Sequence, residues 1–110
     1  MKQKDALATL AALAQDTRLA IFRHLVKAGP EGAAAGDIAH TLKVAAPTLS
    51  FHLKELEHAG LVLSRRESRS IIYSANYERM RALLAFLMED CCGGRPKICN
   101  VTARRKECAA

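Results

Sequence analysis

The spacing of apolar residues predicts a succession of short helices in the first half of the chain. Leucine and alanine recur every three or four positions in residues 4–14. A second apolar face with this period begins after Asp16 and runs to Gly29-Pro30, a pair that stops helices. A shorter helix is predicted over residues 36–42. Only a tight connector separates it from the next helix, at residues 47–60, so the two are predicted to form a helix-turn-helix unit.

The helix predicted over residues 47–60 has the clearest pattern and organises the rest of the chain. Three leucines recur at i, i+4 and i+7 and form one narrow apolar stripe: Leu49, Leu53 and Leu56. Pro47 suits the first helical position because it needs no backbone donor there. Gly60 stands where a left-handed residue ends a helix. Because the stripe is narrow, most of this helix is predicted to face outward.

The outward side of this helix carries side chains that suit a DNA groove. At about 100° per residue, Thr48, Phe51, His52 and Glu55 are predicted to fall together on that side, with Ser50 beside them. Hydroxyls, an imidazole and an aromatic edge fit against base edges in a major groove. On these residues alone, the alternative is a solvated helix face on any small helical domain.

After Gly60 the pattern changes to that of two strands, residues 61–66 and 70–74, which are rich in β-branched and aromatic residues. The turn between them, Glu67-Ser68-Arg69, lacks glycine, and a loop of three to five residues is expected. Three arginines gather near its tip: Arg65, Arg66 and Arg69. A charged tip is often only a solvated turn, but a basic hairpin directly after a helix-turn-helix favours a wing that contacts phosphates.

A last helix is predicted over residues 77–90, with Asn76 as its cap. Its apolar stripe is broader than packing within so small a domain requires: Met80, Leu83, Leu84, Leu87 and Met88. The first and last helices are therefore predicted to form a two-fold dimer interface. The fold class is mainly α with a small β-hairpin, a winged helix-turn-helix domain over residues 1–90. Residues 91–110 form a cysteine-rich basic tail.

The net charge of +6 comes mainly from that tail, so it supports a polyanionic partner only weakly. Residues 64–81 are more informative, with five arginines against two glutamates. Apolar runs are too short to span a membrane, and no secretory signal is recognised. The expected location is cytoplasmic, where thiols stay reduced. We expect no enzyme, because neither a hydrolase-like Ser, His, Asp order nor a glycine-rich phosphate loop occurs.

Three cysteines, Cys91, Cys92 and Cys99, lie within nine residues. Gly93-Gly94 breaks the helix and lets the chain fold back, so the thiolates can converge on one soft ion. A pyramidal three-coordinate ion such as As(III) or Sb(III) suits such a set. The alternatives are structural zinc with Cys108 as fourth ligand, a redox sensor that closes a disulfide, and cysteines without a function.

Several stretches resemble the ArsR/SmtB family of bacterial metal-responsive repressors. They are Asp16-Thr17-Arg18-Leu19, Leu49-Ser50-Phe51-His52-Leu53-Lys54-Glu55-Leu56, Ala59-Gly60-Leu61-Val62 and the arginine-rich hairpin ending in Ile72-Tyr73. The resemblance covers about residues 5–90 and implies a winged helix-turn-helix homodimer that represses an operon and dissociates when an ion binds. Two familiar ligand sets of the family are missing, because residues 35–42 contain no cysteine and residues 77–89 contain no histidine.

Together these observations predict a repressor of an arsenic-resistance operon that binds two-fold operator DNA as a homodimer. Thr48, Ser50, Phe51 and His52 are assigned to the groove, and four cations are assigned to phosphates: Lys54, Arg65, Arg66 and Arg69. As(III) or Sb(III) is expected to bind Cys91, Cys92 and Cys99 and to release the DNA. A redox- or zinc-responsive repressor of the same fold is one alternative, and a soft-metal scavenging thiol protein without DNA binding is the other.

Overall fold

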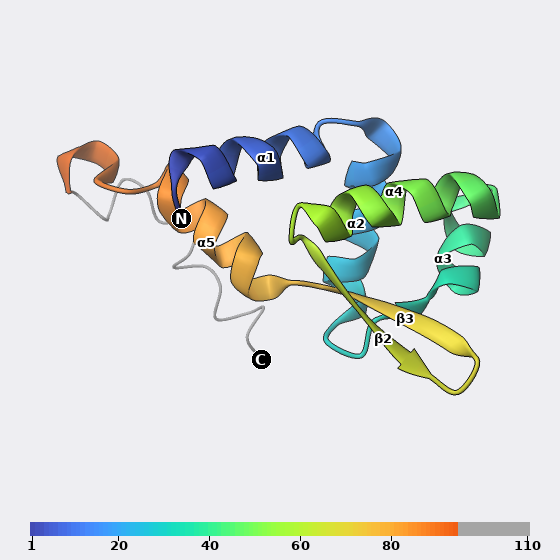
Figure 1. Cartoon of the computed structure of the whole chain (residues 1–110). Helices are drawn as coiled ribbons and strands as arrows, with labels where there is room; N and C mark the ends of the chain where they lie inside the picture. The colour runs from blue at the N-terminus through green and yellow to red at the C-terminus, as the bar shows by residue number, and fades with distance from the viewer. Residues whose placement is uncertain (95–110) are drawn as a thin grey trace.

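The computed structural model describes residues 1–94, and residues 95–110 lie outside the described part of the chain. Figure 1 shows the helices gathered around one end of a small twisted sheet, whose hairpin projects away from them. The elements follow in this order: α1 (Gln3–Leu13), α2 (Asp16–Ala28), β1 (Ala33–Ala34), α3 (Ala35–Leu42), α4 (Ala46–His58), β2 (Val62–Glu67), β3 (Ser70–Ala75), α5 (Tyr77–Leu87) and the 3-10 turn η1 (Cys91–Gly93). The predicted winged helix-turn-helix architecture is confirmed. None of the helices in residues 1–94 has the length and apolarity that crossing a membrane requires.

The core lies where α2, α3 and α4 meet the base of the sheet. Each helix contributes the apolar positions of its 3.6-residue period, as the sequence predicts. The buried residues of this core come from α2, α3, α4, the strands and the turn before β2: Ile21, Phe22, Leu25, Ile38, Leu49, Leu53, Leu56, Leu61, Val62 and Ala75. Full burial of one such aliphatic side chain contributes about 1.5–3 kcal/mol. This shared core fixes α4 relative to α2 and to the strands.

The end of α4 is a tightly bonded turn that leads into β2. Gly60 has φ +80°, its N–H donates to the Glu57 carbonyl at 3.0 Å, and the Leu61 N–H donates to the Leu56 carbonyl at 2.9 Å. These two bonds make a Schellman motif, with the left-handed glycine in the predicted place. Leu56 and Leu61 are both fully buried, so the motif is sealed by an apolar contact.

Asn76 ties the end of α4 to the beginning of α5. Its Oδ1 accepts the Arg79 N–H at 3.2 Å, which confirms the predicted cap, and its Nδ2 donates to the Gly60 carbonyl at 2.8 Å. The Arg79 side chain donates from Nε to the Ala59 carbonyl at 3.2 Å. A positive charge there suits the negative end of the α4 dipole. The end of α4 and the beginning of α5 are therefore joined through backbone carbonyls.

The sheet is antiparallel with strand order β1-β3-β2, and its first strand was not predicted. Residues 33 and 34 are both alanines, which carry no alternating pattern, yet they pair with Tyr73 and Ile72 of β3. Gly32 precedes them with φ +75° and lies against the Tyr73 carbonyl, so a β-carbon there would be only 2.3 Å from that oxygen. This close approach lets the segment join the sheet.

The hairpin loop is shorter than the sequence suggests. Glu67 pairs with Ser70, which leaves only Ser68 and Arg69 in the loop, so the expectation of three to five residues is wrong. Ser68 takes the positive φ of +56° that a two-residue hairpin requires and that glycine usually supplies. The sequence-based estimate of the loop length was too long because the turn lacks the glycine that usually marks a two-residue hairpin loop.

The helix α5 is also shorter than expected, because it ends at Leu87 rather than near residue 90. The next residues include Glu89 and Asp90, whose negative charges are unfavourable at the carbonyl end of a helix. Asp90 adopts a left-handed conformation with φ +55°. The cysteine pair consequently lies in a separate turn beyond the helix.

Candidate nucleic-acid interface

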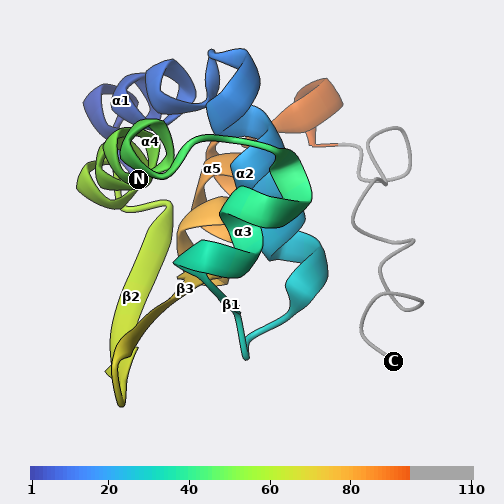
Figure 2. The ribbon, with the colours of Figure 1, turned by 90° about the vertical axis from the view of Figure 1, so that its right-hand side faces the viewer.

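The helix-turn-helix is formed by α3 and α4, which are joined by three residues, Lys43 to Ala45. Lys43 is left-handed, with φ +57°, and its N–H closes on the Ala39 carbonyl, which also accepts the Val44 N–H at 3.0 Å. This turn lets α4 pack across α3 on the shared core. Figure 2 looks along α4, with α3 beside it and the β2–β3 hairpin extending to one side.

The outward side of α4 carries four of the residues assigned to DNA. Thr48, Ser50, Phe51 and Lys54 are all exposed, whereas the leucine stripe on the opposite side is buried. Phe51 is 57% exposed, which is unusual for an aromatic side chain. The surface is therefore small, partly apolar and supplied with hydroxyl groups and a cation, a combination that fits base edges and phosphates.

His52 lies on the other side of the helix, so its predicted outward placement is wrong. Its side chain is only 7% exposed, and its Nδ1 lies 3.3 Å from Nη1 of Arg18 in α2. The position is three residues after Leu49 and four before Leu56, which places it on the apolar stripe. An imidazole is tolerated there because Arg18 supplies a polar partner.

The base of the hairpin is attached to α4. The Ser64 hydroxyl donates to Oε2 of Glu57 at 2.8 Å. Tyr73 pairs with Ser64 across the strands and so shares its face. Burial raises the pKa of the Tyr73 phenol, and the negative charge of Glu57 adds to the rise. The phenol therefore stays protonated at neutral pH. The hydrogen bond from Ser64 to Glu57 holds the base of the hairpin in a defined direction relative to α4.

The three wing arginines have different surroundings. Arg65 donates from Nε to Glu67 at 2.8 Å and from Nη2 to the Glu31 carbonyl at 2.7 Å, so it braces the hairpin against the loop after α2. The side chains of Arg66 and Arg69 are exposed and make no hydrogen bond or ion pair within residues 1–94. Arg66 and Arg69 are thus available to an anionic partner, whereas Arg65 already has protein partners.

The cysteine pair lies where α5 has ended. Cys92 is left-handed with φ +53°, and its Sγ is 3.4 Å from the Sγ of Cys91. In a continuous helix neighbouring side chains diverge by about 100°, so the break in the helix is what brings the sulfurs together. Cys99, the third predicted ligand, and Cys108 lie outside the described residues. Among residues 1–94 there is no group of three or more His, Cys, Asp or Glu side chains placed to hold a metal ion.

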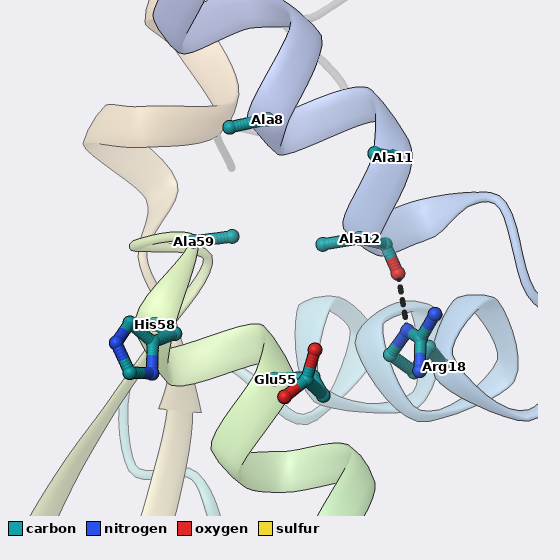
Figure 3. A pocket seen from close by; sticks show the side chains of 7 residues that line it. All are labelled: Ala8, Ala11, Ala12, Arg18, Glu55, His58 and Ala59. Atoms are coloured by element: carbon teal, nitrogen blue, oxygen red, sulfur yellow. Dashed lines mark hydrogen bonds between the residues drawn. The ribbon is translucent and has the colours of Figure 1, made fainter.

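An open pocket of about 440 Å³ lies between α1 and the second half of α4. Its walls are mostly alanine methyl groups, with three polar side chains at its edges (Figure 3): Arg18, Glu55 and His58. Arg18 Nε donates to the Ala12 carbonyl at 2.7 Å, which connects the end of α1 to α2. The sequence offered no signal for this pocket, because alanines at helical spacing indicate only a helix.

An outward helix face that carries hydroxyl groups and a lysine, a hairpin braced beside it and a shared core define a DNA-binding protein of the winged helix-turn-helix class. Comparison with known proteins agrees with this class. A model of the helix-turn-helix domain matches residues 13–65. The HTH-type transcriptional regulator YgaV of Escherichia coli (strain K12) is 32% identical over 89 residues, which cover 81% of this chain and 88% of that protein.

Solved structures also agree with the winged helix-turn-helix class. An ArsR-like transcriptional regulator from Rhodococcus sp. RHA1 has a TM-score of 0.69 at 26% identity and matches 94% of this chain and 92% of its own. A homodimeric winged helix-turn-helix DNA-binding domain from Mycobacterium bovis, a possible ArsR-family regulator, has a TM-score of 0.63 at 28% identity, covering 79% and 81%. The chain belongs to the helix-turn-helix transcriptional regulators, and the solved structures that it resembles include ArsR-like regulators. Its relatives are regulators rather than enzymes.

Proposed function

We propose that this regulator is a homodimeric repressor of an arsenic-resistance operon, released from its operator when As(III) or Sb(III) binds Cys91, Cys92 and Cys99. The observation that carries the proposal is the pair of sulfurs 3.4 Å apart at one end of α5, while the other end of α5 is bonded to the end of α4. The proposed ligand site and α4, the proposed reading helix, thus lie beyond opposite ends of α5.

The DNA-binding half of the proposal rests on the exposed face of α4 and the wing. Thr48, Ser50 and Phe51 would line the major groove, with Phe51 suited to apolar contact with a thymine methyl group. Lys54, Arg66 and Arg69 would hold phosphates. We assign Arg65 to bracing the wing rather than to a phosphate, and we do not assign His52 to the groove, because each already has a protein partner.

The dimer half rests on apolar side chains of α1 and α5 that this chain leaves uncovered. Leu7 is 60% exposed, Leu87 is 55% exposed and Leu10 is also exposed. The two helices that carry them pack side by side at one end of the molecule (Figure 1), so we assign these leucines to one interface. The Mycobacterium bovis relative is homodimeric, which supports the same assembly here. Two copies would present two reading helices to a two-fold operator.

Three thiols fit a metalloid ion because thiolates are soft ligands that select thiophilic ions. Two of the three sulfurs lie 3.4 Å apart in the η1 turn, and Gly93 and Gly94, both at positive φ, would give the chain the freedom to bring Cys99 back. In the fully reduced protein, each thiol would give its proton to a hydroxide of arsenous acid, which would leave as water while an As–S bond formed. Tightening of this turn would shift α5 and, through Asn76 and Arg79, the end of α4. A coupling free energy of about 2 kcal/mol lies in the usual range and corresponds to roughly thirtyfold weaker operator binding.

Replacing Cys91 and Cys99 together by serine should leave operator binding intact and abolish its release by arsenite. The reason is that a serine hydroxyl is a hard ligand and does not form the stable bond to As(III) that a thiolate forms. Fluorescence anisotropy of labelled operator DNA, titrated with arsenite under reducing conditions, measures the effect. On addition of arsenite, the operator affinity of the wild type should fall roughly thirtyfold and that of the variant by less than twofold.

Cys108→Ser is the matched control and should release like the wild type. Release of the double variant at the wild-type arsenite concentration would refute the three-cysteine site. Parallel titrations with Sb(III), Zn²⁺ and peroxide separate the metalloid switch from a zinc or redox switch in the same thiols.

Arg66→Ala combined with Arg69→Ala should weaken operator binding about tenfold and flatten its salt dependence. Each phosphate contact contributes about 0.9 to the slope of log affinity against log salt, so a dimer that loses two arginines per protomer should lose about 3 to 4. The measurement is operator affinity across a series of KCl concentrations. Lys2→Ala with Lys4→Ala removes the same charge from the N-terminal end of α1, far from the wing in Figure 1, and should change the slope little. Equal slopes for the two double variants would refute the wing as a phosphate contact.

A further inference from the structure

His52 is a buried polar side chain on the reading helix that the proposed contacts with DNA do not use. Its Nδ1 lies 3.3 Å from Nη1 of Arg18. A guanidinium has only donors, so Nδ1 must be the acceptor, and the proton of the neutral ring is on Nε2. The imidazole is therefore held in one orientation from within the protein.

Arg18 is itself fixed at three places. Its backbone N–H donates to Oε1 of Gln15 at 2.8 Å, which makes Gln15 the cap of α2. Its Nε donates to the Ala12 carbonyl at the end of α1 (Figure 3), and its Nη1 contacts His52. Arg18, at the start of α2, thus connects the end of α1 and the middle of α4 through its guanidinium group.

On its other side His52 contacts the most exposed aromatic side chain of the reading helix. The rings of His52 and Phe51 are 5.4 Å apart at an interplanar angle of 62°, an edge-to-face arrangement. Aromatic pairs prefer this geometry over a face-to-face stack, so the contact favours one orientation of the Phe51 ring. An exposed phenylalanine without such a contact would have to be immobilised when it meets DNA, at a cost in side-chain entropy.

We infer that His52 is a positioning residue for sequence recognition: held by Arg18, it orients the Phe51 ring toward the base that Phe51 reads. The inference rests on the proposed DNA-binding function of α4. It assigns a specificity role to a residue that does not touch DNA. It also makes the end of α1, a helix of the proposed dimer interface, part of the support of the base-reading side chain.

The test uses a duplex selected by the full-length wild-type protein from a randomised pool, together with every single-base substitution of that duplex. A wild type that selects no sequence would refute the proposed function itself, independently of His52. With a selected duplex in hand, Phe51→Ala identifies the base-pair position at which discrimination depends on Phe51. That discrimination should fall about three- to tenfold, the value of one apolar base contact.

His52→Asn keeps an acceptor near the place of Nδ1, so that Arg18 retains a partner, but removes the ring from Phe51. It should reduce sequence discrimination about threefold or more at the base pair that depends on Phe51, and at no other base pair. When His52→Asn is combined with Phe51→Ala, discrimination at that base pair should fall by less than a further twofold. A merely structural role would lower affinity for all sequences alike, and a direct base contact would flatten a different position with additive losses. Either of these results would overturn the inference.

Arg18→Lys supplies a second readout that does not alter α4. An ammonium group lacks the planar fork that reaches Ala12 and His52 together. The variant should reduce discrimination at the same base pair and leave the others unchanged. Lys54→Ala serves as the control for a phosphate contact, because it should weaken binding to all duplexes uniformly. Unchanged discrimination in Arg18→Lys, with the protein folded by circular dichroism, would refute the link through the guanidinium.

Discussion

Replacing Leu7 and Leu10 by glutamate is expected to convert the protein to a monomer and to weaken its binding to a two-fold operator by more than about a hundredfold. The two leucines form part of the exposed apolar surface on α1, next to α5. In the proposed dimer, the glutamates would bury unpaired negative charges in the interface. A monomer holds only one half-site and loses the effective concentration of the second reading helix, which is typically worth a factor of 10² to 10⁴.

Sedimentation at micromolar concentration and operator titration measure this pair of effects. Leu19→Glu is a suitable control because Leu19 is also an exposed leucine but lies on α2, outside the proposed interface. It should remain dimeric and bind normally. A Leu7→Glu, Leu10→Glu protein that sediments as a dimer would place the interface elsewhere.

Gly32→Ala is expected to lower the free energy of unfolding by about 3 kcal/mol. Part of this loss is the cost of a positive φ for a residue with a β-carbon, roughly 1–2 kcal/mol. The rest follows from the Tyr73 carbonyl, which would lie 2.3 Å from the new methyl group. Because that oxygen belongs to the backbone of β3, relief requires β1 to move away from the sheet.

Gly36→Ala is the matched control for this substitution. Gly36 lies within α3, has no positive φ, and a β-carbon there would meet nothing within 4 Å. The change should raise the free energy of unfolding by about 0.5–1 kcal/mol, because alanine favours a helix over glycine. Urea unfolding at one fixed protein concentration measures both variants, since the stability of a dimer depends on concentration. Equal stabilities would mean that β1 is not held against β3 as the structure shows.

The link between α5 and α4 shows why the proposed switch needs no large movement. Asn76 caps α5 and also donates to the carbonyl of Gly60, so the two helices share a residue at their junction. The Tyr77 hydroxyl donates to the Val26 carbonyl at 2.9 Å and anchors the same junction on α2. In the proposed switch, a small displacement of α5 would therefore be passed to α4 through short hydrogen bonds.

The sequence by itself determined the helices, the hairpin and the class of the fold. The apolar stripe of α4 is buried because the 3.6-residue period places its leucines on one side of the helix: Leu49, Leu53 and Leu56. Gly60 and Asn76 stand at helix ends because of local backbone chemistry, a positive φ and a side-chain cap. These features depend on neighbours within a few residues, which a sequence displays directly.

Only the tertiary structure decided which polar residues are available to a partner. His52 is buried because Arg18, 34 positions away, provides its partner, and Arg65 braces the wing because the Glu31 carbonyl, also 34 positions away, lies within its reach. The pairing of two alanines as β1 likewise depends on the approach of Gly32 to Tyr73. Each of these outcomes is set by groups that folding brings together from distant parts of the chain, and no local pattern records them.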